Sequence, residues 1–311
     1  MKHISRINQT YTEGSKIMAV KKASELFGKV NVYDPADGKK RVEIYIRLNQ
    51  RLEGMKMGIA VDGSASMMPN FAASIPPAFR SPGMNQVEPV TRTLTQYLSS
   101  LSGEGFSKLI YWAVGPGGKE TETIGDISTE NAMEAKFDGP SAKQWGTDTY
   151  LLPVLKYYME EYKDAGWAFL LIITDGKLSD LEDVKAYCME LAKKIVESGR
   201  KMKFVIVGVG SEVDSEQIGG LDDMFEGTPY EEDVDLWDGK IANEMADIPE
   251  VTDEVDWGIV LPGTVRITDD QANAVYSKTD GFPNRMEFKV PEGAKSVTIE
   301  IAGQVIEQYL E

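Results

Sequence analysis

The chain has 311 residues, 42% of them hydrophobic and 27% charged, a composition typical of a globular protein with one large domain and a smaller one. Its net charge of −17 disfavours nucleic-acid binding, because contacts to phosphates need basic patches. The single cysteine, Cys188, excludes disulfide bonds and a cysteine metal cluster, and the single histidine, His3, leaves little general-base chemistry near neutral pH.

Two further absences concern the location of the protein. No apolar run approaches the roughly 20 residues of a membrane span. The segment Met1–Gln9 has no apolar stretch of the kind found in signal peptides. We therefore expect no membrane span and a cytoplasmic protein.

The first predicted elements are two strands near the N-terminus. Residues 29–33 and 41–48 have strand character, and residues 34–38 between them are rich in turn formers. The second segment alternates apolar and polar residues, which is typical of a strand with one buried face.

From about residue 55 to residue 247 the sequence alternates between strand and helix patterns. Strands are predicted at 55–61, 108–114, 121–127, 167–174 and 203–208, and helices at 86–101, 149–162, 179–198, 215–224 and 238–245. Ser179 is the predicted N-cap of its helix. Apolar strands separated by helices indicate right-handed crossovers and a sheet covered on both faces. The predicted fold class is α/β, with a doubly wound, mainly parallel, Rossmann-like sheet.

After Trp257 the pattern becomes β again. Strands are predicted at 263–268, 274–279, 285–290 and 296–301. These are too few for a full sandwich, so we expect the N-terminal strands to pair with the C-terminal ones. The predicted domains are 1–51 (strands pairing with the C-terminal domain), 52–250 (the α/β domain) and 251–311 (the rest of a smaller β-sandwich).

Residues 62–66, Asp-Gly-Ser-Ala-Ser, form the most informative segment. The Asp62 carboxylate and the hydroxyls of Ser64 and Ser66 follow an apolar strand, at the edge where open α/β sheets hold ligands. Hard oxygen donors suit Mg²⁺, Mn²⁺ or Ca²⁺ rather than zinc or copper. The segment alone is weak support for a site, because Asp and Ser are ordinary turn residues.

Two later segments can complete a cation site. Gly146-Thr147 precedes a predicted helix, so that the Thr147 hydroxyl either faces the site or caps the helix, as Asp148 also can. Thr149 competes with Thr147 as the ligand. Asp175 ends an apolar strand, either as a ligand or as a turn residue. Together the three segments predict one shared metal site, with the ligands Asp62, Ser64, Ser66, Thr147 and Asp175.

The order Asp62-x-Ser64-x-Ser66, Gly146-Thr147 and Thr174-Asp175-Gly176 resembles the metal-ion-dependent adhesion site (MIDAS) of von Willebrand factor A (VWA) domains, over residues 52–247. The resemblance implies direct ligation by Ser64, Ser66 and Thr147. It also implies that Asp62 and Asp175 bind directly or through water, and that a protein partner's Asp or Glu completes the coordination. Mg²⁺ is favoured, with Ca²⁺ and Mn²⁺ left open.

Two details qualify this resemblance. Trp145 stands where the family often has a second glycine. The β flanks and the absence of a signal peptide resemble bacterial tellurium-resistance and copine-like intracellular members, which implies a role in bacterial stress response.

Three functions follow as alternatives. The favoured one is a metal-dependent protein–protein interaction module without catalytic residues, hence not an enzyme. A magnesium-dependent phosphatase or hydrolase would use Asp62 as nucleophile, with Lys177 as the obvious phosphate-binding cation, but Ser64 stands where such phosphatases usually have a second Asp. A structural protein would self-assemble through its strand edges.

A long loop follows the Asp-Gly-Ser-Ala-Ser segment and continues to about residue 85. Loops of this length are uncommon unless they are functional or mobile. Met67, Met68 and Phe71 either form an apolar contact surface beside the site or pack beneath the loop.

Overall fold

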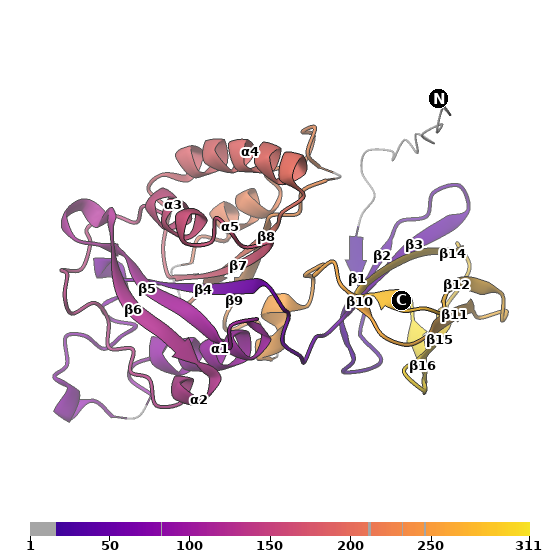
Figure 1. Ribbon diagram of the computed structural model, residues 1–311, viewed down its shortest axis with the longest axis horizontal. Coiled ribbons are helices and arrows are strands. Elements are labelled where there is room, and N and C mark those ends of the chain that lie inside the picture. The colour runs from indigo at the N-terminus through magenta and orange to yellow at the C-terminus, as the bar shows by residue number, and fades with distance from the viewer. Residues whose placement is uncertain (1–16, 82, 211–212, 232, 246) are drawn as a thin grey trace. The chain divides into compact units, whose positions relative to one another are not determined.

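The computed structural model describes residues 17–81, 83–210, 213–231, 233–245 and 247–311. His3 and the segment Met1–Gln9, which entered the predictions above, lie outside the described residues. The chain divides into two compact units (Figure 1): unit 1 comprises Met1–Arg47 and Thr252–Glu311, and unit 2 comprises Leu48–Val251. Unit 1 is thus formed by the two ends of the chain, and unit 2 by its middle.

Unit 2 is built on a six-stranded sheet in the order β6-β5-β4-β7-β8-β9. Its strands are β4 (Met55–Asp62), β5 (Phe106–Val114), β6 (Glu120–Ser128), β7 (Trp167–Thr174), β8 (Lys201–Gly208) and β9 (Trp237–Ile241). Neighbouring strands pair in parallel except for β6, which runs antiparallel to β5 at one edge. The central strands β4 and β7 are apolar along most of their length because both faces of the sheet are covered.

The helices of the described residues all belong to unit 2. They are α1 (Val87–Leu101), α2 (Thr129–Ala132), α3 (Leu152–Glu161), α4 (Leu181–Ser198) and α5 (Ser215–Asp222), with short 3-10 turns at η1 (Ala65–Met67), η2 (Pro77–Phe79), η3 (Pro116–Gly118) and η4 (Ile248–Thr252), the last of which ends in unit 1. Helices α3, α4 and α5 lie on one face of the sheet (Figure 1), and α1 packs against β4, β5 and β6. None of the described helices combines the length and apolarity needed to cross a membrane.

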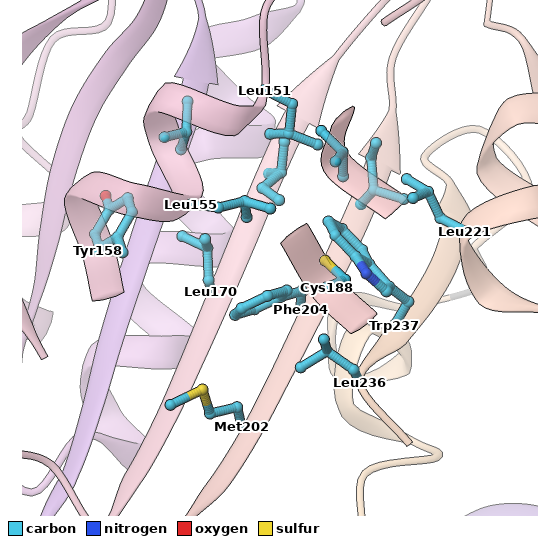
Figure 2. Close-up of a cluster of buried hydrophobic side chains, with 14 of the residues drawn as sticks. Leu151, Leu155, Tyr158, Leu170, Cys188, Met202, Phe204, Leu221, Leu236 and Trp237 are labelled. Atoms are coloured by element: carbon cyan, nitrogen blue, oxygen red, sulfur yellow. The ribbon is translucent and has the colours of Figure 1, made fainter. Parts of the chain in front are cut away.

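The core between the sheet and helices α3, α4 and α5 is filled by large apolar side chains (Figure 2). Phe204 and Trp237 meet edge to face, with ring centroids 5.1 Å apart. The Tyr158 hydroxyl lies 2.9 Å from the carbonyl oxygens of Ile59 and Lys108, so the buried ring of this helix residue is tied to the sheet. A Cβ at Gly58 would lie 2.4 Å from that ring, which explains the glycine in a central strand.

Unit 1 contains antiparallel sheets in the orders β1-β2-β3-β14, β12-β11-β15-β16 and β10-β13. The strands are β1 (Ile17–Ala19), β2 (Phe27–Tyr33), β3 (Lys39–Ile46), β10 (Val260–Leu261), β11 (Val265–Asp269), β12 (Ala274–Lys278), β13 (Phe282–Pro283), β14 (Arg285–Pro291), β15 (Ser296–Ile301) and β16 (Gln304–Tyr309). β14 pairs with β3 along the whole length of β14, so strands from the two ends of the chain share a sheet. Apolar side chains of the two larger sheets form one core.

A buried ionic cluster lies on the face of β3 opposite this core. Glu43 is 1% exposed and accepts hydrogen bonds from the Tyr33 hydroxyl (2.8 Å), Arg41 (2.7 Å) and Arg285 (2.8 Å). The Arg41 guanidinium also lies 3.4 Å from the centroid of the Tyr33 ring. The carboxylate therefore joins β2, β3 and β14 across the sheet.

The predicted α/β class is wrong for the chain as a whole. The described residues contain sixteen strands and only five α-helices, one of them four residues long, so most of the regular structure is β. The physical reason is that antiparallel strands connect through short turns, whereas only parallel neighbours need a helical crossover. The prediction generalised the pattern of unit 2, whose sheet is itself mixed, to a protein with further antiparallel sheets.

Two local predictions also fail. Residues 238–245 were expected to form a helix, but Trp237–Ile241 is strand β9, because pairing with β8 and burial of Trp237 override the local pattern. Ser179 does not cap α4, whose N-cap is Asp180. The Ser179 hydroxyl instead accepts a hydrogen bond from the Thr149 N–H at 3.1 Å.

Candidate functional site

The candidate site lies at the carboxyl ends of β4 and β7. These strands are parallel neighbours, with Val61 opposite Ile173, so Asp62 and Asp175 come to the same edge of the sheet. The chain passes from β4 to β5 on one side and reaches β7 on the other, which makes this the switch point where open parallel sheets form a ligand crevice.

Asp62 forms the buried base of the site. Its side chain is 0% exposed. Its Oδ1 accepts a hydrogen bond from the Ser64 N–H at 2.7 Å, and its Oδ2 accepts one from the Thr174 hydroxyl at 2.7 Å. Burial raises the pKa of Asp62 to about 7, although the hydrogen bonds from Thr174 and Ser64 lower it. A positive charge placed beside this carboxylate would favour its ionised form.

Above Asp62 a chain of hydrogen bonds joins four further side chains. The hydroxyls of Ser64 and Ser66 are 3.0 Å apart, and the Ser66 hydroxyl donates to Asp175 Oδ1 at 2.8 Å. Asn70 Nδ2 donates to Asp175 Oδ2 at 3.0 Å. Ser64 and Asp175 are buried, whereas Ser66 is exposed, so the site opens to solvent on the Ser66 side. We call Asp62, Ser64, Ser66 and Asp175 the oxygen cluster.

Thr147 is brought to the same edge by its backbone. Gly146 bridges Ser64 in parallel, donating its N–H to the Gly63 carbonyl at 3.1 Å and accepting from the Ala65 N–H at 2.7 Å. A Cβ at Gly146 would lie 2.1 Å from the Ala113 carbonyl oxygen, so only glycine fits there. The Thr147 hydroxyl donates to Asp148 Oδ2 at 2.9 Å and is exposed, so Thr147 is a neighbour of the oxygen cluster rather than part of its hydrogen-bond chain.

Helix α3 obtains its N-terminal cap from another segment. The Asp180 carboxylate accepts from the N–H groups of Leu151 and Leu152, each at 2.9 Å. This removes the alternative that Thr147 or Asp148 is present to cap the helix. Thr149 is buried and its backbone pairs with Ser179, which makes it the weaker candidate for a ligand.

The donor atoms fit a small divalent cation. Adjacent oxygens around an octahedral Mg²⁺ with bonds of about 2.1 Å are about 3.0 Å apart. The separations of Ser64 Oγ from Ser66 Oγ and of Ser66 Oγ from Asp175 Oδ1 are 3.0 Å and 2.8 Å, which suit both the hydrogen bonds seen and the edges of such a site. The described residues hold no group of three or more His, Cys, Asp or Glu side chains suited to a metal ion, so a cation here would depend on hydroxyl oxygens.

Sequence reasoning overlooked two residues of the site. Thr174 was quoted as part of a motif without a role, yet it donates to the buried carboxylate of Asp62. Asn70 was placed in the loop, yet it contacts Asp175. Asn70 lies beyond the 3-10 turn η1, so no helical spacing in the sequence indicated that its side chain faces the site.

The loop after the oxygen cluster packs its first apolar residues inward. Met67 and Phe71 are both 0% exposed, so they do not form a contact surface. Phe71 meets the half-buried Trp145 edge to face, with centroids 5.3 Å apart. Of the larger apolar side chains in this loop, Phe79 is 77% exposed and Met84 is 40% exposed.

Comparison with known proteins finds distant structural likenesses. No family model and no curated protein matches this chain. The pilus adhesin SpaC from Lactobacillus rhamnosus GG, in an open conformation, is similar over 97% of this chain and 49% of its own, with 11% identity and a TM-score of 0.40. A second SpaC structure is similar over 97% of this chain and 50% of its own, with 12% identity and a TM-score of 0.39. The PilB minor pilin from Streptococcus sanguinis is similar over 77% of this chain and 75% of its own, with 10% identity and a TM-score of 0.38. This chain spans about half the length of the SpaC structures.

These findings contradict the predicted membership in the VWA family. No family model matches, and the described residues hold no group of three or more His, Cys, Asp or Glu side chains suited to a metal ion. The assignment is wrong, together with its MIDAS, the Rossmann-like label and the tellurium-resistance and copine-like subgroup. Three short motifs carried the resemblance, and Asp, Ser, Thr and Gly are common at strand ends of many folds. The oxygen cluster does not depend on the resemblance, because its distances come from the structure.

Proposed function

We propose that unit 2 is a protein-binding module that holds a divalent cation at the oxygen cluster and, through it, a partner's Asp or Glu carboxylate. The chain of oxygens from Ser64 through Ser66 to Asp175, at the open edge above the buried Asp62, is the observation that carries the proposal. Thr147 is the candidate for a further ligand, since its neighbour Gly146 bridges Ser64. Mg²⁺ is the favoured cation.

Electrostatics explains why such a site would capture a carboxylate. Hydroxyl ligands are neutral, so they leave most of the charge of the ion uncompensated. Both oxygens of the Asp62 carboxylate accept hydrogen bonds, from Ser64 and Thr174. Asp62 therefore acts on the ion through its nearby negative charge and does not surround the ion with its oxygens. A partner carboxylate approaching from the exposed Ser66 side would therefore be attracted strongly.

The two alternatives receive less support. A phosphatase needs an accessible nucleophile, but Asp62 is 0% exposed. Lys177, the cation proposed to bind phosphate, lies 3.4 Å from Asp214 and is 77% exposed. An assembly protein would use open strand edges, which β12 and β16 of unit 1 provide, and no further observation on the described residues favours that function.

Cation binding tests the proposal directly. Mn²⁺ titrated into the full chain and followed by electron paramagnetic resonance should bind the wild type, and Ser64→Ala with Ser66→Ala should weaken binding at least tenfold, because two ligands are lost. Ser198→Ala is the control, because this exposed hydroxyl donates to the Lys194 carbonyl and accepts from the Arg200 N–H, outside the oxygen cluster. Adding a short peptide with one Asp should perturb the bound Mn²⁺ signal, and its Asn counterpart should not. Equal Mn²⁺ binding by the double variant and the wild type would overturn the proposal.

A further inference from the structure

In both carboxylates of the oxygen cluster, each of the two oxygens accepts a hydrogen bond from a neutral donor. Asp62 accepts from Ser64 and Thr174, one donor for each oxygen. Asp175 accepts from Ser66 through Oδ1 and from Asn70 through Oδ2. A cation can therefore bind Asp175 through Oδ1 without affecting the bond to Asn70, whereas binding through both oxygens makes the ion compete with the Asn70 N–H for Oδ2.

This arrangement bears on the choice between Mg²⁺ and Ca²⁺. Mg²⁺ takes six ligands at short, near-octahedral positions and readily binds a carboxylate through one oxygen. Ca²⁺ takes six to eight ligands at longer distances and often gains the extra ones by binding a carboxylate through both oxygens. A carboxylate whose second oxygen is already held by the Asn70 N–H thus favours the smaller ion.

We infer that Asn70 is a positioning residue that sets the cation preference of the oxygen cluster, by holding Asp175 in a one-oxygen orientation that favours Mg²⁺ over Ca²⁺. This inference rests on the proposed function. Asn70 is itself held in place on several sides. Its backbone carbonyl oxygen accepts from the Gln86 N–H at 2.8 Å. Its side-chain Nδ2 lies 3.7 Å from Met67 Sδ, and a Cβ at Gly210 would come within 3.2 Å of that nitrogen.

The test compares the Mg²⁺ and Ca²⁺ affinities of the full chain by calorimetric titration. Asn70→Leu removes the donor at similar size, and Asn70→Ala removes it at smaller size in case the first variant does not fold. Each should raise the affinity for Ca²⁺ relative to Mg²⁺ by about tenfold, because a charge-assisted hydrogen bond no longer opposes two-oxygen binding.

The chain offers a matched control in unit 1. Asn273 Nδ2 donates to Asp269 Oδ2 at 3.0 Å, the same pair of residue types at the same distance, and neither residue belongs to the oxygen cluster. Asn273→Leu should leave the ratio of the two affinities unchanged. If the wild type binds Mg²⁺ but neither Asn70 variant shifts the ratio, or Asn273→Leu shifts it equally, the inference is overturned while the proposed function stands. If the wild type binds neither ion, the proposed function itself fails.

Discussion

Asp62→Asn tests the cost of burying a carboxylate at the end of β4. The pKa of Asp62 is raised from 3.8 to about 7, chiefly by burial. Between these two values the unfolded chain has released the proton while the folded protein still holds it, so the stability of the metal-free protein falls as the pH rises. A shift of about three pKa units corresponds to about 4 kcal/mol at the upper end of the window, at 1.36 kcal/mol per unit.

The asparagine variant cannot lose this proton. Its stability relative to the wild type should therefore rise between pH 4.5 and pH 7.5, approaching the full difference of about 4 kcal/mol only above pH 7. Urea unfolding in the presence of a chelator measures this difference, with tryptophan fluorescence as the probe because four of the five tryptophans lie in unit 2. Comparing the two proteins at each pH cancels the titration of all other groups.

Asp214→Asn is the control for an aspartate in the opposite situation. The N–H of Gln217 lowers the pKa of Asp214, so its contribution to stability is present above the unfolded pKa and is lost only at more acidic pH. Its stability difference from the wild type should stay flat between pH 4.5 and pH 7.5. A flat difference for Asp62→Asn as well would refute the burial argument. Adding Mg²⁺ should shrink the pH dependence of the wild type, because a cation favours the ionised carboxylate.

Two further predictions concern stability. Gly58→Ala should destabilise unit 2 by about 1–3 kcal/mol, measured by urea unfolding, because the new Cβ would lie 2.4 Å from the Tyr158 ring; unchanged stability would mean that the ring has room to move. Glu43→Leu should destabilise unit 1 by about 3–5 kcal/mol, measured by calorimetric unfolding, because Arg41 and Arg285 lose the buried carboxylate that they share. Glu307→Leu, on the exposed side of β16, is the control and should destabilise the unit far less.

The strands that carry the oxygen cluster could be located from the sequence. The predicted strand at 167–174 is confirmed as β7, and the one at 55–61 as β4 with one more residue. Both are nearly continuous apolar runs that stop at a carboxylate, because a strand covered on both faces must be apolar and the first polar residue falls at the edge of the sheet. Prediction from the local sequence pattern fails where burial depends on a partner distant in sequence. Strand β9 is an example, because it pairs with β8 and its Trp237 ring packs against Phe204 of that strand.

The fold class was mistaken for a related reason. Helical crossovers dominate the middle of the sequence, whereas the two ends, which pair through β3 and β14, contribute antiparallel strands that outnumber the strands of unit 2. Short apolar strands such as β1, β10 and β13 lie below the length at which periodicity identifies a strand.

The sequence by itself determined which residues carry oxygen donors at strand ends, since Asp62, Ser64, Ser66 and Asp175 all follow apolar runs closely. Only the tertiary structure decided that β4 and β7 are neighbours, which brings Ser66 and Asp175 to 2.8 Å across 109 residues of chain. It also decided that Asn70 contacts Asp175 and that the Thr147 hydroxyl bonds to Asp148. Strand order and side-chain direction depend on packing between segments distant in sequence, and no local pattern records them.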